Sequence, residues 1–282
     1  METVLDAEPR LGPLYARAAL GAVGPRGREL PDRVVVREGV TADPDRLAGY
    51  ARVCGFAVGD TLPPTYPAVL SFPLQVALMA DRAFPLALPG LVHVRNVITA
   101  RRGLTVVEPL RIAVHAERFA GHPKGATVDL VTEVRADGAT AWECRSTYLA
   151  RGATAPEAAE SVPPEPVGVD GGPPTAVWRV DAGTGRRYAG VSGDVNPIHL
   201  HPLTARAFGF RRAIAHGMWT AARALASLQG RLPGALTYDV AFGRPLLLPS
   251  TVELRTRAAG EGWDLDVRPA RVTGHHLRAA VR

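Results

Sequence analysis

The feature that most constrains the fold of this chain is a pattern of helix and strands that occurs twice. Between Leu91 and Arg151, apolar and polar side chains alternate in four segments separated by short turns that contain glycine. A period of two is typical of antiparallel strands. An apolar helix is predicted ahead of these strands, over residues 72–84.

The second copy of the pattern follows residue 174. A strand over 176–180 leads into a short helix through Tyr188 and a longer helix just after Gly217. Four more strands are then predicted, at 236–245, 251–260, 263–269 and 275–282. Between the two copies, residues 152–174 are rich in proline, glycine, alanine and glutamate without periodicity, which is typical of a linker.

Three smaller elements are predicted near the N-terminus. Residues 14–24 have the pattern of an amphipathic helix, and residues 32–40 alternate as a strand does. Asp43 followed by Pro44 is a helix start, because aspartate caps a free N–H group and proline suits the first helical position. The helix that they open should run through Tyr50 to Gly55.

The two halves also share a short sequence, since YARVCG at 50–55 parallels YAGVSG at 188–193. In an alignment continued without gaps, Phe56, Val58 and Thr61 of the first half stand opposite Asp194, Asn196 and His199 of the second. We therefore expect an internal repeat within the α+β class. Its parts are a first half without reactive groups, the linker and a reactive second half, which occupy residues 1–151, 152–174 and 175–282.

The reactive groups gather between Tyr188 and Met218. Asp194, Asn196 and His199 surround an Asn-Pro turn, which brings the chain back on itself. A carboxylate and an imidazole on such a turn can reach one small volume, as general acid–base chemistry requires.

Gly217 lies close to the start of the predicted helix at 219–229. The free N–H groups and the dipole at a helix start favour a developing negative charge. Close packing would equally require a glycine here, and both explanations can hold.

The family that this stretch resembles is that of the MaoC-like dehydratases, or type 2 enoyl-thioester hydratases. The resemblance is carried by Tyr188-Ala189-x-x-Ser192-Gly193-Asp194-x-Asn196-Pro197-Ile198-His199, then Ala205, Gly209-Phe210 and Ile214-x-His216-Gly217-Met218. It covers about a tenth of the chain directly. It implies a double hot-dog fold, in which two helix-wrapped antiparallel sheets are fused in one chain. It also implies a hydro-lyase that reversibly adds water to trans-2-enoyl thioesters, giving (3R)-hydroxyacyl products.

The resemblance implies roles for individual residues of this sequence. Asp194 and His199 would hold the water that adds across the double bond, and Gly217 would bind the thioester carbonyl through its N–H group. Asn196 would orient the site or brace the turn. Ser192 and His216 are expected to orient groups around them, because a histidine beside a helix start is more often structural than catalytic.

The first half offers a place for the acyl chain. Because Phe56 and Val58 replace an acid and an amide, this half could open an apolar tunnel for longer chains. We therefore expect it to bind the acyl group rather than to catalyse.

No cofactor is expected beyond the coenzyme A or phosphopantetheine arm of an acyl-CoA or acyl carrier protein substrate. A metal is not expected, because Asp194, His199, His201 and His216 match no zinc spacing. Paired arginines at 186–187 and 211–212 could meet carrier phosphates, although exposed arginines are usually solvated surface.

Composition excludes several other classes. The chain has 282 residues, of which 46% are hydrophobic and 21% charged, as in globular proteins. The net charge of +6 is spread without a basic stripe, so nucleic acid is not an expected partner. No apolar run is long enough for a membrane span, and the acidic N-terminus does not resemble a secretory signal. With only two cysteines, a cytoplasmic location is expected.

Two alternatives to the hydro-lyase remain open. One is a thioesterase on the same fold, which would attack the carbonyl instead of the β-carbon. The other is a non-catalytic protein that binds acyl thioesters. The intact motif of the second half favours the hydro-lyase. The sequence does not decide the chain length, the carrier, the pathway (fatty-acid or polyketide metabolism) or whether the chain forms a homodimer.

Overall fold

A computed structural model describes residues 1–20, 27–156 and 164–282 of the chain. The described helices are α1 Leu11–Leu20, α2 Pro44–Cys54, α3 Pro67–Met79, α4 Thr184–Ser192, α5 Pro197–Leu200, α6 Pro202–Ala207 and α7 Gly217–Ala226. The strands of the first half are β1 Glu2–Val4, β2 Val34–Val40, β3 Leu91–Ala100, β4 Leu110–His122, β5 Gly125–Ala136 and β6 Ala139–Arg151. Those of the second half are β7 Ala176–Val180, β8 Leu236–Phe242, β9 Ser250–Ala259, β10 Gly262–Pro269 and β11 Leu277–Val281.

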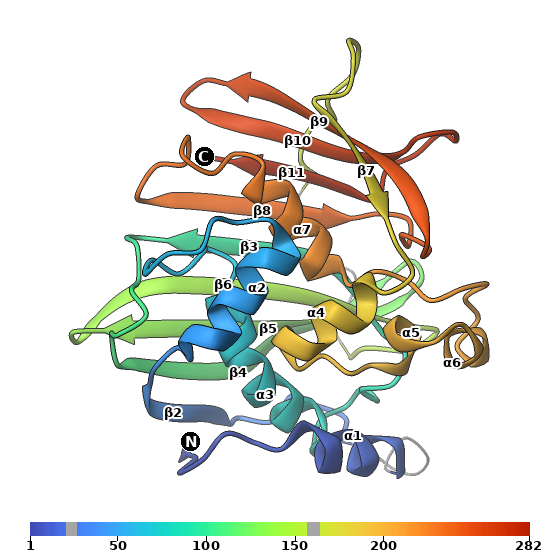
Figure 1. Cartoon of the computed structure of the whole chain (residues 1–282). Coiled ribbons are helices and arrows are strands. Elements are labelled where there is room, and N and C mark those ends of the chain that lie inside the picture. The colour runs from blue at the N-terminus through green and yellow to red at the C-terminus, as the bar shows by residue number, and fades with distance from the viewer. Residues whose placement is uncertain (21–26, 157–163) are drawn as a thin grey trace.

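All of these strands belong to one 11-stranded sheet, in the order β1-β2-β4-β5-β6-β3-β8-β11-β10-β9-β7. The order within β2-β4-β5-β6-β3 is repeated by β7-β9-β10-β11-β8, so each half has the same topology. Figure 1 shows the larger helices of both halves on one face of the sheet. This is the double hot-dog fold that the resemblance implied.

The two halves meet where β3 pairs with β8 in antiparallel register. Across this junction the Arg95 guanidinium lies 2.7 Å from the Asp239 carboxylate. The halves therefore share a continuous sheet, joined edge to edge as in a two-fold dimer.

The short sequence repeat corresponds to equivalent helices. Gly55 caps the C-terminus of α2 and Gly193 caps that of α4, with positive φ angles of 84° and 79°. Their tyrosines, Tyr50 and Tyr188, face each other with ring centroids 6.1 Å apart. The repeat seen in the sequence is thus a structural repeat, with the two tyrosines in contact between the halves.

The central helices are buried because they are apolar on most sides. Ten residues of α3 and seven of α7 are buried. The sequence placed the first of these helices at 72–84, but α3 begins at Pro67 and ends at Met79. The predicted start was too late because proline is compatible with the first turn of a helix. Pro67, the last residue of the proline-rich segment, is therefore the first residue of α3.

Two other predictions fall partly on residues that the structure does not describe. The helix predicted at 14–24 is described as α1, Leu11–Leu20, and residues 21–24 lie outside the described part. The linker predicted at 152–174 includes the undescribed residues 157–163. Of its described part, residues 164–174 form no helix or strand, and Asp170 pairs with Arg268 at 2.7 Å.

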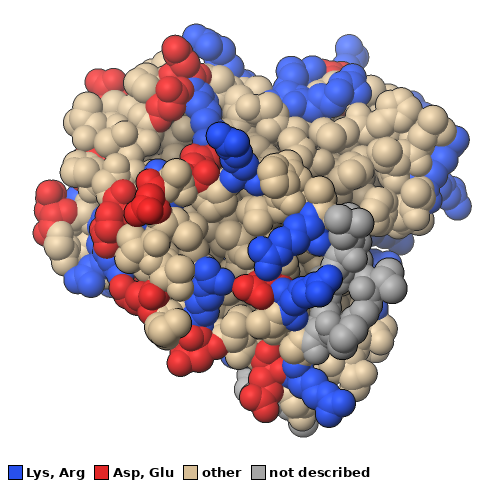
Figure 2. All heavy atoms as spheres, turned by 90° about the horizontal axis from the view of Figure 1, so that it is seen from below, with Lys and Arg blue, Asp and Glu red and all other residues tan. Residues whose placement is uncertain are grey.

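Many arginines at the surface are paired with acids. Arg111, for example, lies 2.7 Å from Glu2 and 2.9 Å from Glu38. Figure 2 shows basic and acidic side chains interspersed over the face seen from below. None of the described helices is both long and apolar enough to cross a membrane.

Candidate active site

The candidate site is built on the loop that joins α4 to α5. Because α4 ends at Gly193 in a left-handed conformation, the chain turns sharply just before Asp194. Asn196 then caps α5, its side chain accepting a hydrogen bond from the Ile198 N–H at 3.3 Å. Asp194 is thus held between the end of one helix and the cap of the next.

The Asp194 carboxylate accepts two hydrogen bonds through Oδ1. The Asn196 N–H and the Tyr15 hydroxyl each donate to it at 3.1 Å. Burial acts to raise the pKa of Asp194, but His216, His199 and these two donors together lower it below its ordinary value. The group is therefore a carboxylate at neutral pH, with Oδ2 available to a ligand.

His199 is buried on α5, with 8% of its surface exposed. Its Nδ1 lies 2.9 Å from the Ile214 carbonyl oxygen. A carbonyl can only accept, so Nδ1 carries the proton and Nε2 presents a lone pair. Burial lowers the pKa of His199, against the opposing effects of Asp194 and of the Ile214 carbonyl. A neutral ring with a fixed tautomer is suited to act as a base.

His216 braces the site from the start of α7. Its Nε2 donates to the Asp194 backbone carbonyl at 3.0 Å, and its ring stacks on His199 with centroids 3.6 Å apart. Burial and His199 lower the pKa of His216 to about 3, so the ring is neutral near pH 7. Because its ring N–H donates to a backbone carbonyl, His216 is suited to the orienting role expected for it.

Gly217 is the first residue of α7, and the side chain of His216 does not cap this helix. The early N–H groups of a helix have no partner within it, so the Gly217 N–H can bind an oxygen from the cavity. A Cβ at this position would lie 3.1 Å from the Phe242 ring. Both explanations for the glycine therefore agree with the structure.

Ser192 is buried at the end of α4, and its hydroxyl accepts a hydrogen bond from the Asp194 N–H at 3.2 Å. It fixes the backbone of the acid, as an orienting residue would. The structure thus brings all six predicted residues to one cavity, which is lined by Asp194, His199, Gly217, Asn196, Ser192 and His216.

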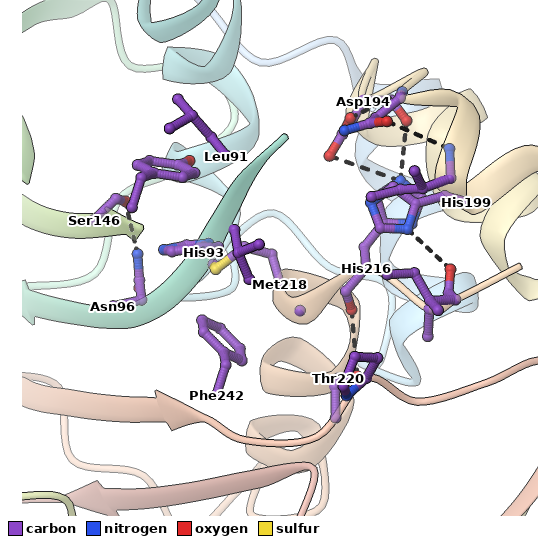
Figure 3. A pocket seen from close by; sticks show the side chains of 18 of the residues that line it. Leu91, His93, Asn96, Ser146, Asp194, His199, His216, Met218, Thr220 and Phe242 are labelled. Atoms are coloured by element: carbon purple, nitrogen blue, oxygen red, sulfur yellow. Dashed lines mark hydrogen bonds and ion pairs between the residues drawn. The ribbon is translucent and has the colours of Figure 1, made fainter. Parts of the chain in front are cut away.

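This cavity, of about 220 Å³, extends from the second half into the first. Its first-half wall comes from α3, β3 and β6, through Val69, Phe72, His93, Asn96 and Tyr148 among others. Figure 3 shows His93 and Asn96 across the cavity from Asp194 and His199, with Met218 between the two sides. Phe56 is buried elsewhere, 6.4 Å from the Tyr50 ring, and Val58 is exposed. Neither of them lines the cavity, although the alignment pointed to both.

Two parts of the site were not found from the sequence. Tyr15 lies in α1, 179 residues before Asp194, and the N-terminal helix carries no motif that would indicate this contact. His93 and Asn96 lie in a strand whose alternation predicted only a sheet. Contacts between residues so far apart in the sequence arise from the pairing of the halves.

Possible metal ligands also meet here, since atoms of Asp194, His199 and His216 lie within 4.8 Å of one another. The two imidazole rings, however, are stacked at an interplanar angle of 25°. Because the lone pairs of imidazole lie in the ring plane, two stacked rings do not aim them at one point. The expectation of no metal stays a prediction.

The fold and the site together define a double hot-dog protein with an acid–histidine pair in one half. The MaoC like domain family matches residues 173–273. A 3-hydroxyacyl-thioester dehydratase X of Mycobacterium tuberculosis is 41% identical over 268 residues, covering 94% of this chain and 95% of its own length.

Solved structures agree with this match. The crystal structure of HtdX of Mycobacterium tuberculosis has a TM-score of 0.79 at 39% identity, covering 89% of this chain and 99% of that chain. A MaoC-like dehydratase from Phytophthora capsici shares the fold, with a TM-score of 0.73 at 18% identity and coverage of 90% and 95%. The chain belongs to the MaoC-like dehydratase family.

Proposed function

We propose that this protein is a hydro-lyase that reversibly adds water to trans-2-enoyl thioesters and so interconverts them with (3R)-hydroxyacyl thioesters. The observation that carries the proposal is the pairing of the Asp194 carboxylate with the neutral ring of His199 in one cavity. The match to a 3-hydroxyacyl-thioester dehydratase along nearly the whole chain supports the same reaction.

The two groups are close enough to share one water molecule. The ligand atoms of Asp194 and His199 lie no more than 4.8 Å apart, so one water can lie within hydrogen-bond reach of both. Oδ2 of Asp194 and Nε2 of His199 both accept, so the two protons of the water point to them and its oxygen lone pair faces the substrate.

Hydration then proceeds with the pair as acid and base. The water oxygen bonds to the β-carbon while one member of the pair takes a proton, and electrons of the double bond move toward the thioester carbonyl. The pair returns a proton to the α-carbon. Hydrogen and hydroxyl are thereby added to the double bond, and both residues regain their starting states.

The Gly217 N–H would stabilise the negative charge that develops on the thioester oxygen. Such a donor contributes about 3 kcal/mol to the transition state. The acyl chain would extend from this point into the first half, past Met218 towards α3 and β3, which is the acyl-binding role expected for residues 1–151.

The thioester carrier would enter where exposed residues line the cavity. Arg151 and Arg244 are exposed members of its lining, and their charge suits the phosphates of coenzyme A or of a phosphopantetheine arm. We propose no further cofactor, a cytoplasmic location, and either a monomer or a homodimer.

Loss of enoyl absorbance tests the reaction directly, with trans-2-enoyl thioesters of coenzyme A and of acyl carrier protein. Asp194→Asn and His199→Ala should each lower kcat by about a thousandfold, as loss of an acid–base group does. His201→Asn is the matched control, because His201 is exposed and caps α6 with a side-chain acceptor that asparagine keeps.

The same assay separates the alternatives. Release of free thiol without loss of the double bond would identify a thioesterase. Binding of saturated acyl-CoA by a protein that neither hydrates nor hydrolyses would identify a non-catalytic binding protein.

A further inference from the structure

The cavity wall opposite Asp194 and His199 carries polar side chains among the apolar ones that an acyl tunnel would require. It is formed by β3 and β6, in which His93 pairs with Tyr148 and Asn96 pairs with Ser146. The register shifts between His93 and Arg95, which leaves Val94 as the extra residue of a β-bulge. Because of this bulge, His93 and Asn96 face the same side of the strand although they lie three residues apart.

Asn96 is almost fully buried, with 1% of its surface exposed. Its Nδ2 donates to the Ser146 hydroxyl at 2.9 Å and to the Cys144 sulfur at 3.1 Å. Its Oδ1 is buried and accepts no hydrogen bond from the described residues. One acceptor of this side chain is therefore left to a ligand in the cavity.

His93 provides a second unpaired polar atom beside it. The ring packs between Tyr148 and Phe242, with centroids 4.7 Å and 4.8 Å away. Burial lowers the pKa of His93 to about 4, against opposing effects of the Arg95 backbone and Asp194. The ring is therefore neutral near pH 7. Its Nε2 is buried and has no hydrogen-bond partner among the described residues.

The neighbouring polar side chains Gln75 and Tyr148, in contrast, have hydrogen-bond partners. Gln75 donates through Nε2 to the Thr132 hydroxyl at 3.1 Å, and the Tyr148 hydroxyl donates to Gln75 Oε1 at 3.4 Å. On the first-half wall the unpaired atoms belong to Asn96 and His93, which stand together in Figure 3 on the side of the cavity facing Met218, whereas the unpaired Nδ1 of His216 lies on the opposite side.

A plain hydrocarbon chain is a poor occupant of such a wall. It would leave both atoms without a hydrogen-bond partner, which is unfavourable. A carboxylate has no proton for Asn96 Oδ1 and would bring a second negative charge near Asp194, and a ketone likewise has no proton to donate. A hydroxyl group is uncharged, and it can donate its proton to Asn96 Oδ1 while its oxygen accepts a hydrogen bond from the Nε2–H tautomer of His93.

We propose that His93 and Asn96 bind a hydroxyl group on the acyl chain, beyond the carbons that react. The substrate class is then an enoyl or 3-hydroxyacyl thioester with an additional hydroxyl further along the chain. Apolar neighbours such as Leu91, Met218 and Phe242 hold the methylene groups on either side of it. This inference rests on the proposed hydro-lyase function.

The test compares coenzyme A thioesters of equal chain length, with and without a hydroxyl at successive carbons beyond the double bond. For at least one position, kcat/KM should exceed that of the plain chain by about tenfold, the effect of satisfying one otherwise unpaired buried acceptor. Calorimetry with the saturated thioesters should give the same preference in Kd, and it requires no turnover.

Asn96→Leu and His93→Phe should each remove most of this preference, because both keep the size of the side chain but lack the unpaired polar atom. Thr99→Val is the control, since Thr99 lies on the same strand but on its opposite face. Two variants are used so that a folding defect in one leaves the other to decide.

The outcomes separate the two proposals. If enoyl thioesters are hydrated but no hydroxylated chain is preferred in kcat/KM or in Kd, the hydroxyl site is refuted and the hydro-lyase stands. If hydroxylated chains bind more tightly and are never hydrated, the hydro-lyase is refuted and the hydroxyl site stands. A preference that survives both substitutions would also overturn the assignment to His93 and Asn96.

Discussion

Three titratable groups in the site are each oriented by a backbone or hydroxyl hydrogen-bond partner. The Ile214 carbonyl fixes the proton of His199 on Nδ1, and the Asp194 carbonyl fixes that of His216 on Nε2. The Tyr15 hydroxyl donates to the Asp194 carboxylate. Each partner leaves the reacting atom free while it orients the rest of the group, so these contacts should control the pH dependence of the reaction.

Tyr15→Phe tests this at one residue. Loss of the donor should raise the pKa of Asp194, because a hydrogen bond to the charged form of a carboxyl favours that form. The acid limb of the profile of kcat against pH should then move to higher pH, with kcat about tenfold lower at its maximum. Tyr66→Phe is the matched control, since the buried Tyr66 hydroxyl has no partner among the described residues. An unchanged acid limb would contradict the role of Tyr15.

The stacked arrangement of His199 and His216 leads to a prediction about metals. Because two stacked rings do not aim their lone pairs at one ion, we expect prolonged treatment with a chelator to leave hydration unchanged. Elemental analysis of the purified protein should show no stoichiometric zinc, iron or manganese. Loss of activity that returns on adding one of these ions would contradict this expectation.

At the scale of the elements, the equivalent helices α2 and α4 differ in how they begin. The start of α2 is capped by Asp43, which accepts a hydrogen bond from the Arg46 N–H at 2.7 Å, whereas Gly183 at the start of α4 makes no side-chain cap. Of these two helices, only α2 is therefore stabilised by the side chain of its own N-cap residue.

Asp43→Ala should lower the free energy of unfolding by about 1 kcal/mol, as loss of an N-cap does. Asp45→Ala is the control, because Asp45 lies in the first turn of the same helix without being its cap. Urea denaturation of the three proteins measures the difference. Equal losses in both variants would show that the charge, and not the cap, stabilises α2.

At the scale of the whole molecule, burial of neutral histidines makes stability depend on pH. The pKa of His93 is lowered to about 4, below the value of about 6.5 in an unfolded chain. Below pH 6.5 the unfolded chain therefore binds a proton that the native protein does not, and the native state loses stability as the pH falls towards 4.

His93→Phe should reduce this acid sensitivity, because phenylalanine keeps the stacking but does not titrate. Between pH 6.5 and 4.5, the wild-type protein should lose on the order of 2 kcal/mol more than the variant. Chemical denaturation at a series of pH values measures both. Parallel curves would mean that His93 takes up its proton in the native protein.

The sequence determined the strands of both halves, the repeat and the reactive loop. These features are local, since alternation predicts strands, and Asp194, Asn196 and His199 lie within six consecutive residues around a turn. The sequence also placed a helix start close to Gly217, because alanine-rich segments favour helix wherever they occur.

Only the tertiary structure decided what surrounds this loop. Tyr15 reaches Asp194 across 179 residues, and the bulge in β3 turns His93 and Asn96 into the cavity. Neither contact has a sequence pattern, because each depends on how β3 pairs with β6 and β8 and on how α1 packs against the second half. The reactive groups lie in one short stretch of the sequence. The shape and polarity of the cavity that would receive the acyl chain arise instead from the pairing of the two halves.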